Sequence, residues 1–142
     1  MFEASSFTST EKRDTRREDE ALHWLRQQAE PLRLRFVTQV VAQNYPGAHE
    51  FIRRAQLSPQ SLEELFRGGL LTADASTIRY WLAAVTDGLG WRRVIDLLRQ
   101  HIATDVAAVG RALYWLPSLL PAGDTEARQS YEQLRDSCTN AA

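Results

Sequence analysis

Apolar residues recur at helical spacing along most of the chain. Ile78, Trp81, Leu82 and Val85, for example, stand at i, i+3, i+4 and i+7, which is the pattern of one buried helix face. The same period predicts helices over residues 18–30, 31–44, 48–56, 61–67, 78–87, 91–102, 104–116 and 124–138. No stretch predicts a strand convincingly. The sequence therefore predicts an all-α fold, a compact bundle of about seven or eight short helices with short loops.

The segment over residues 31–44 begins ambiguously. Its first residues, Leu32 to Phe36, alternate between apolar and basic side chains as a strand would. Its continuation instead repeats as a helix, through Phe36, Val37, Val40 and Val41. Pro31 suits a first helical position, so a helix is predicted. Ser58 and Pro59 likewise predict an N-cap followed by Pro in the first turn, and a capping box from Ser61 to Glu64 is a second possible start.

The chain is long enough for one domain, because 142 residues can bury a sizeable core without a disulfide or a metal. Residues 1–18 mix Ser, Thr and charged side chains with almost no apolar period, which predicts a flexible tail. A single helical domain is expected over residues 19–138, and a short tail over 139–142.

Composition and charge narrow the class of protein. Apolar residues make up 44% and charged residues 25% of the chain, the balance of an ordinary soluble protein. A net charge of −1 gives no global field that would draw the chain to DNA or anionic lipid. No run is apolar and long enough to cross a bilayer or to act as a secretory signal, and the one cysteine, Cys138, suits a reducing compartment. The cytoplasm is therefore the expected location.

Arginine strongly outnumbers lysine. The 17 basic residues include a single lysine, Lys12. Arginine forms planar, two-pronged ion pairs and stacks on aromatic rings, whereas lysine is a more hydrated point charge. The excess therefore indicates either an interaction surface rich in specific ion pairs or a GC-rich genome, whose codons favour arginine.

The positions of the histidines and the cysteine along the sequence give little indication of catalytic chemistry. His23, His49 and His101 fall on three different predicted helices. His49-Glu50 begins like a zinc-protease motif, but residue 53 is Arg where the second histidine would stand. Cys138 lies too near the chain end to be held as a nucleophile. We expect no enzyme activity, and no catalytic, cofactor-binding or metal-binding residue is predicted.

Two further classes remain as alternatives. Residues 61–82 loosely resemble a helix-turn-helix, but the turn is long and the second helix offers only Arg79 for DNA contact. DNA binding is therefore disfavoured, although it stays open. The triplet Tyr-Trp-Leu occurs at 80–82 and again at 114–116, a spacing of helical repeat arrays. A HEAT-like repeat scaffold is the other alternative.

Residues 32–103 combine several short motifs in order. They are Tyr45-Pro46, Phe51-Ile52-Arg53-Arg54, the leucines 57, 62 and 65, Ile78 with Trp81, and Gly90-Trp91 followed by Val94, Ile95 and Leu98. In this order they resemble the bacterial effector-associated domains, small all-α modules related in architecture to animal death and death-effector domains. The stretch ELFRGGLLTADASTIRYWL is also similar to death-effector domains. The resemblance covers about half of the chain, and the helices over 104–138 are additional to it.

The resemblance implies an adaptor that associates with itself or with a related helical domain in bacterial defence or signalling. Charged helix faces would dock on one another, which sets register and partner choice. The expected positive face is Arg53, Arg54, Arg92 and Arg93, and the expected negative face is Glu63, Glu64 and Asp96. Trp91 lies on the apolar stripe of its helix and is expected to pack, while Arg92 and Arg93 are expected to face water. No cofactor, nucleic acid or membrane is expected as a partner, and an oligomer is possible.

Overall fold

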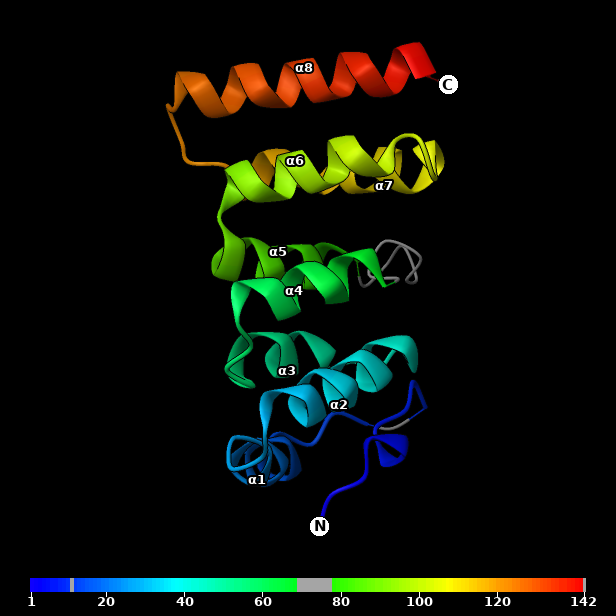
Figure 1. Ribbon diagram of the computed structural model, residues 1–142, viewed down its shortest axis with the longest axis vertical. Helices are drawn as coiled ribbons and strands as arrows, with labels where there is room; N and C mark the ends of the chain where they lie inside the picture. The colour runs from blue at the N-terminus through cyan, green and yellow to red at the C-terminus, as the bar shows by residue number, and fades with distance from the viewer. Residues whose placement is uncertain (11, 69–77, 142) are drawn as a thin grey trace.

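Helices account for the fold (Figure 1). The computed structural model describes residues 1–10, 12–68 and 78–141, and this part of the chain holds eight α-helices and no strand. The all-α prediction is confirmed. The α-helices are α1 (Thr15–Leu25), α2 (Glu30–Ala42), α3 (Ala48–Arg54), α4 (Pro59–Arg67), α5 (Ile78–Leu89), α6 (Trp91–His101), α7 (Val106–Trp115) and α8 (Thr125–Ala141). Two 3-10 helices are η1 (Ala4–Ser6) and η3 (Leu116–Leu119).

The helices are stacked in layers along the longest axis of the molecule (Figure 1). The pairs α2 with α3, α4 with α5, and α6 with α7 form successive layers, with α1 below the first and α8 above the last. Each helix also packs on the helix two positions along the chain. One column is therefore α1, α3, α5 and α7, and the other is α2, α4, α6 and α8. The chain ends lie at opposite ends of the stack, as in arrays of helix pairs.

Helices α3 and α5, neighbours in one column, run in the same direction. The ring of His49, in the first turn of α3, lies 5.4 Å from the ring of Tyr80, in the first turn of α5. Arg53, in the last turn of α3, forms an ion pair with Asp87 near the end of α5. Residues 104–138, expected as additional helices, form α7, η3 and α8 and continue the same stack.

The predicted apolar stripes supply the core. Ile78, Trp81, Leu82 and Val85 are all buried, and Trp81 is only 1% exposed. Buried residues from η1 to α8 form one continuous apolar cluster that passes through every layer. The period of the sequence therefore identified the buried face of these helices correctly.

The N-terminal segment differs from the predicted flexible tail. Phe7 is fully buried, with its ring 5.1 Å from the rings of both Tyr45 and Phe51. The side-chain amide of Gln43 donates to the carbonyls of Ala4 (2.8 Å) and Phe7 (2.7 Å). Phe7 stands alone among Ser and Thr, so it forms no apolar period that the sequence could reveal. The residues that bury it belong to the region of α2 and α3, far along the chain. The expected tail at 139–142 also differs, since α8 continues to Ala141.

A carboxylate joins the starts of α2 and α4. Ser58 caps α4 as predicted, its hydroxyl accepting from the Ser61 amide at 3.2 Å, while the capping box one turn later is not used. Glu30 Oε1 accepts from the Ser58 amide and from the Ser61 hydroxyl, each at 2.7 Å. These hydrogen bonds to the charged form lower the pKa of Glu30 to about 2. The cap of α4 is thereby tied to the layer below it.

Phe7→Ala tests whether the N-terminal segment belongs to the core. Removing a buried ring leaves a cavity, so the free energy of unfolding in urea should fall by about 3–5 kcal/mol. Phe2→Ala is the matched control. Phe2 is only partly buried, so its replacement should lower the free energy of unfolding by less. A Phe7→Ala protein as stable as the original chain would mean that residues 1–10 are a tail after all.

Candidate functional site

Most of the charged residues predicted as an interaction surface contact each other or their neighbours within the chain. Arg93 on α6 forms an ion pair with Glu63 on α4, so a member of the expected positive face pairs with one of the negative face. Arg92, also on α6, places Nε and an Nη 3.1 and 2.8 Å from the two carboxylate oxygens of Glu126 on α8. The structure therefore does not separate these residues into a positive and a negative face.

The other predicted residues follow a similar pattern. Arg53 pairs with Asp87 on α5, and Arg54 lies 2.8 Å from Asp19 on α1. Asp96 pairs within α6, at 3.4 Å from Arg99, and Glu64 is exposed on α4. Four of these pairs link helices two positions apart, and we call them the interlayer ion pairs: Arg54–Asp19, Arg53–Asp87, Arg93–Glu63 and Arg92–Glu126.

Trp91 supports the first turn of α6. Its side chain is half-buried and packs against the core, in line with the expected packing. The guanidinium of Arg92 lies over its ring, 4.6 Å from the centroid. The Trp-Arg-Arg stretch therefore positions two interlayer ion pairs, while Arg92 remains exposed and Arg93 half-buried.

A buried polar cluster lies where α1 meets the α2–α3 turn. Glu18 is 1% exposed, and its carboxylate accepts from the Tyr45 hydroxyl at 2.6 Å and from Arg13 Nε at 3.1 Å. Burial, followed by the hydrogen bond to Glu18, raises the pKa of Tyr45 to about 12. Gly47 leaves room for this arrangement, since a Cβ there would overlap the carboxylate and the tyrosine ring.

His49 lies on the edge of this cluster. Its Nδ1 is buried without a hydrogen-bond partner, and its Nε2 lies 3.6 Å from Glu50. Burial, then the positive charge of Arg13, lowers the pKa of His49 below its ordinary value. Glu18, Tyr45 and Arg13 satisfy one another, so the cluster is best explained as a clamp between α1 and the α2–α3 turn.

The remaining candidates for chemistry are placed separately. His23 lies on α1 and His101 on α6, where its ring meets the edge of Phe66. Cys138 is buried on α8 with Sγ 3.7 Å from the carbonyl of Val106. Among the described residues, no group of three His, Cys, Asp or Glu could hold a metal ion. In the same part of the chain, no helix combines the length and the apolar character needed to cross a membrane.

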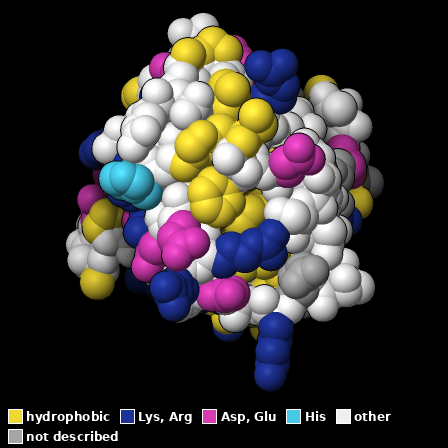
Figure 2. All heavy atoms as spheres, turned by 90° about the horizontal axis from the view of Figure 1, so that it is seen from below, with side chains coloured by type: hydrophobic (Ala, Val, Ile, Leu, Met, Phe, Trp, Pro, Cys, Tyr) yellow, Lys and Arg dark blue, Asp and Glu magenta, His cyan; other side chains and the backbone are white. Residues whose placement is uncertain are grey.

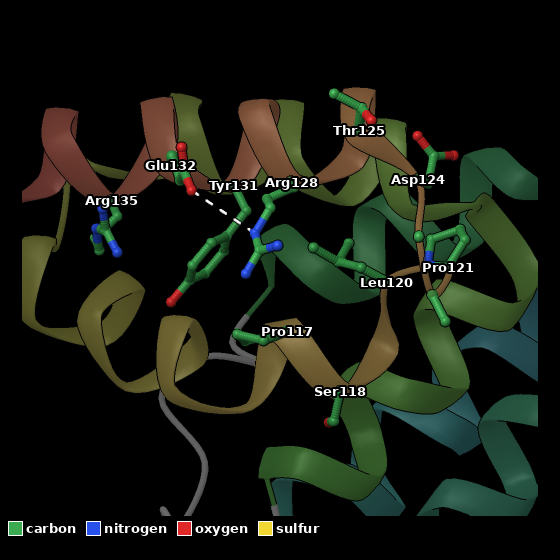
Figure 3. Close-up of a pocket in the computed structure, with 12 residues that line it drawn as sticks. Pro117, Ser118, Leu120, Pro121, Asp124, Thr125, Arg128, Tyr131, Glu132 and Arg135 are labelled. Carbon is green, nitrogen blue, oxygen red and sulfur yellow. Dashed lines mark ion pairs between the residues drawn. The ribbon is translucent and has the colours of Figure 1, made fainter.

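A cleft of about 840 Å³ opens between α8 and the segment from η3 to the start of α8 (Figure 3). Its lining includes Pro117, Leu120, Pro121, Tyr131, Arg128 and Arg135. Figure 3 shows Arg128 and Tyr131 reaching from α8 toward the segment that carries Pro117 and Leu120. The Tyr131 hydroxyl donates to the carbonyl of Leu113 at 3.3 Å, which fixes the ring as one wall of the cleft.

Sequence reasoning missed this cleft. The period of residues 124–138 placed Tyr131 on the buried stripe of its helix, and the ring does pack partly against the core. Arg128 and Arg135 stand two turns apart and flank that stripe, so they carried no signal of their own. The sequence does show that Pro117 and Pro121 interrupt the helical pattern. It does not show which side of α8 this segment faces, because that depends on how the layers stack.

A second hollow lies at the opposite end of the stack. Figure 2 views this end from below and shows hydrophobic side chains gathered in a band, with charged side chains beside it. A hollow of about 350 Å³ between the N-terminal segment and α2 is lined by Phe2, Trp24, Leu32 and Phe36, together with Arg35 and Gln39. This surface is largely apolar.

The comparisons with known proteins add no relative. No protein-family model matches the chain, and no curated protein or solved structure matches it at a significant level. The helix-turn-helix alternative depends on the turn within residues 69–77, which lies outside the described residues. The two Tyr-Trp-Leu triplets lie on α5 and at the junction of α7 with η3, and both of their leucines are buried.

His49 should make stability depend on pH near neutrality. An unfolded histidine takes up a proton near pH 6.5, whereas the lowered pKa keeps His49 neutral in the folded chain to a lower pH. The stabilising contribution is therefore present above pH 6.5 and is lost as pH falls below it. Urea midpoints measured between pH 7.5 and 5.5 should fall, and His49→Gln should flatten that slope.

His23→Gln is the control for this experiment, because His23 is exposed on α1. An unchanged slope in His49→Gln would contradict the assigned role of burial.

Arg93 and Glu63 should be coupled across α4 and α6. A double-mutant cycle with Glu63→Gln and Arg93→Gln, followed by urea unfolding, should give a coupling free energy of roughly 0.2–1 kcal/mol. The pair Arg16–Glu20, which lies within α1 and is far more exposed, is the matched comparison and should couple less strongly. Additive effects of the two substitutions would show that the pair does not join the layers.

Proposed function

We propose that this chain is a non-enzymatic protein-interaction module, in which stacked helix pairs form a scaffold for a partner protein. The observation that carries the proposal is the two-column stack itself. Such stacks build an extended surface from helix faces, and many of them bind other proteins. The four interlayer ion pairs support the same conclusion, because they link α1, α3 and α5 in one column and α4, α6 and α8 in the other.

The resemblance to effector-associated domains leads to a related proposal about mechanism. In that form, like domains would dock through charged helix faces. The interlayer ion pairs make this form less favourable, because a docking partner would have to replace contacts that each arginine already has. Arg92 and Glu126 nevertheless remain largely exposed, so they could take part in docking as a pair. We favour the scaffold form and keep charged docking as the alternative.

Light scattering after size exclusion tests whether the chain associates with itself. A mass that grows with protein concentration and is lost in high salt supports docking between charged faces, because salt screens exposed charges. A dimer that is insensitive to salt supports an apolar contact of the scaffold. A monomer at every concentration rules out self-association and leaves a different protein as the partner.

Charge-swapped variants separate the two roles of the arginines. Arg92→Glu combined with Glu126→Arg, and Arg93→Glu combined with Glu63→Arg, keep each pair in place while reversing the charges that it shows to water. We expect the swapped proteins to keep their helical circular dichroism and melting temperature. If the charged faces dock, association should be abolished. Association that survives in both swapped proteins would exclude these residues from the interface.

A further inference from the structure

We infer that the cleft between η3 and α8 binds an extended segment of a partner protein, in which an acidic side chain stands next to apolar or proline residues. The inference rests on the proposed function and adds to it a site and a ligand chemistry. The lining of the cleft combines a fixed aromatic ring, two proline rings and two arginines (Figure 3).

The apolar part of the cleft is rigid before any ligand arrives. Pro117 and Pro121 have fixed backbone φ angles, and Leu120 stands beside them. Tyr131 is held by its hydrogen bond to the Leu113 carbonyl across from α8. A surface that is already ordered loses little conformational entropy on binding, so it favours an apolar side chain or a proline ring from a partner.

The two arginines are only weakly engaged within the chain. Arg128 lies 3.9 Å from Glu132, and Arg135 lies 3.9 Å from Asp136. Charge-assisted hydrogen bonds between arginine and carboxylate are about 2.7–2.9 Å long, which the interlayer pair Arg92–Glu126 reaches at 2.8 Å. Arg128 and Arg135 can therefore gain a shorter contact from a carboxylate that a ligand brings.

The exposure of these arginines agrees with such a role. Their side chains are 83% and 54% exposed, so a partner can reach them. Arg135 lies 5.9 Å from the centroid of the Tyr131 ring, which places a cation beside the aromatic wall. Binding hot spots are enriched in arginine and tyrosine, the two residue types that form this wall.

The acidic residues of the cleft set the direction of the ligand. Asp124 uses its carboxylate to cap α8, accepting from the Ala127 amide at 3.0 Å, and it lies beside Pro121 at one end of the cleft (Figure 3). Glu132 lies one turn from Arg128 and faces it (Figure 3). Asp124 repels a ligand carboxylate at its end of the cleft, whereas at the other side the single negative charge of Glu132 stands against the two positive charges of Arg128 and Arg135. We therefore expect the acidic group of the ligand at the Arg128–Arg135 side and its apolar group on Leu120 and Pro121.

Fluorescence polarisation with a labelled synthetic peptide tests the inference. The probe is a short peptide that repeats Glu-Leu-Pro, and its control replaces every Glu with Gln. The Glu peptide should bind the full chain roughly tenfold more tightly than the Gln peptide, the gain of one charge-assisted contact. The double variant Arg128→Glu, Arg135→Glu should bind the Glu peptide more weakly than the original chain does, by at least that factor.

Arg16→Glu is the matched charge reversal, because Arg16 is exposed on α1 at the other end of the stack. It should leave the affinity unchanged, and circular dichroism should show that all variants keep their helices. Equal affinity for the Glu and Gln peptides, unchanged affinity after the double reversal, or no binding of either peptide would each overturn the inference. The proposed function is tested separately, by light scattering of the original chain and of the charge-swapped variants, which leave Arg128 and Arg135 unchanged.

Discussion

The stack depends on burial between successive layers. A pair of short helices buries one apolar face within the pair and leaves another uncovered until the next pair packs on it. Here the buried residues of all layers form a single cluster, so no layer has a core of its own. At the N-terminal end the chain covers the last face without a further helix pair. Phe7 enters between Phe36, Tyr45 and Phe51, and Gln43 holds the segment in place.

The same layer contacts explain where the arginines lie. Each interlayer ion pair joins helices two positions apart at the rim of a buried contact. Exposed ion pairs add little free energy, so their main effect is on register: a helix that slid by one turn would lose its partner. Arginine suits this position because its planar group can meet both carboxylate oxygens, as Arg92 does with Glu126. This pairing within the chain gives part of the arginine excess a structural role.

The sequence was sufficient for what depends on local pattern. The stripe of Ile78, Trp81, Leu82 and Val85, and the cap at Ser58, follow from residue type and spacing, and both are found in the structure. The sequence was insufficient wherever a side chain finds its partner across layers. Arg93 and Glu63 are thirty positions apart and were assigned to opposite faces, although they touch. Phe7 was missed for the same reason, because its burial depends on α2 and α3 and not on its neighbours in the chain.

The use of charge between layers also decides which surface can recognise a partner selectively. An arginine that already holds a carboxylate offers a partner only an exchange of one contact for another. The hollow beside Phe2 and Trp24 is mainly apolar, so it discriminates weakly among apolar ligands. The cleft beside α8 differs from both, because its arginines have long ion pairs next to a fixed tyrosine ring. A ligand that carries both a carboxylate and an apolar group gains binding free energy there from two kinds of contact. A ligand that lacks one of these groups gains it from only one. In the scaffold form that we propose, selectivity therefore belongs to the last helix rather than to the charged residues of α3, α4 and α6.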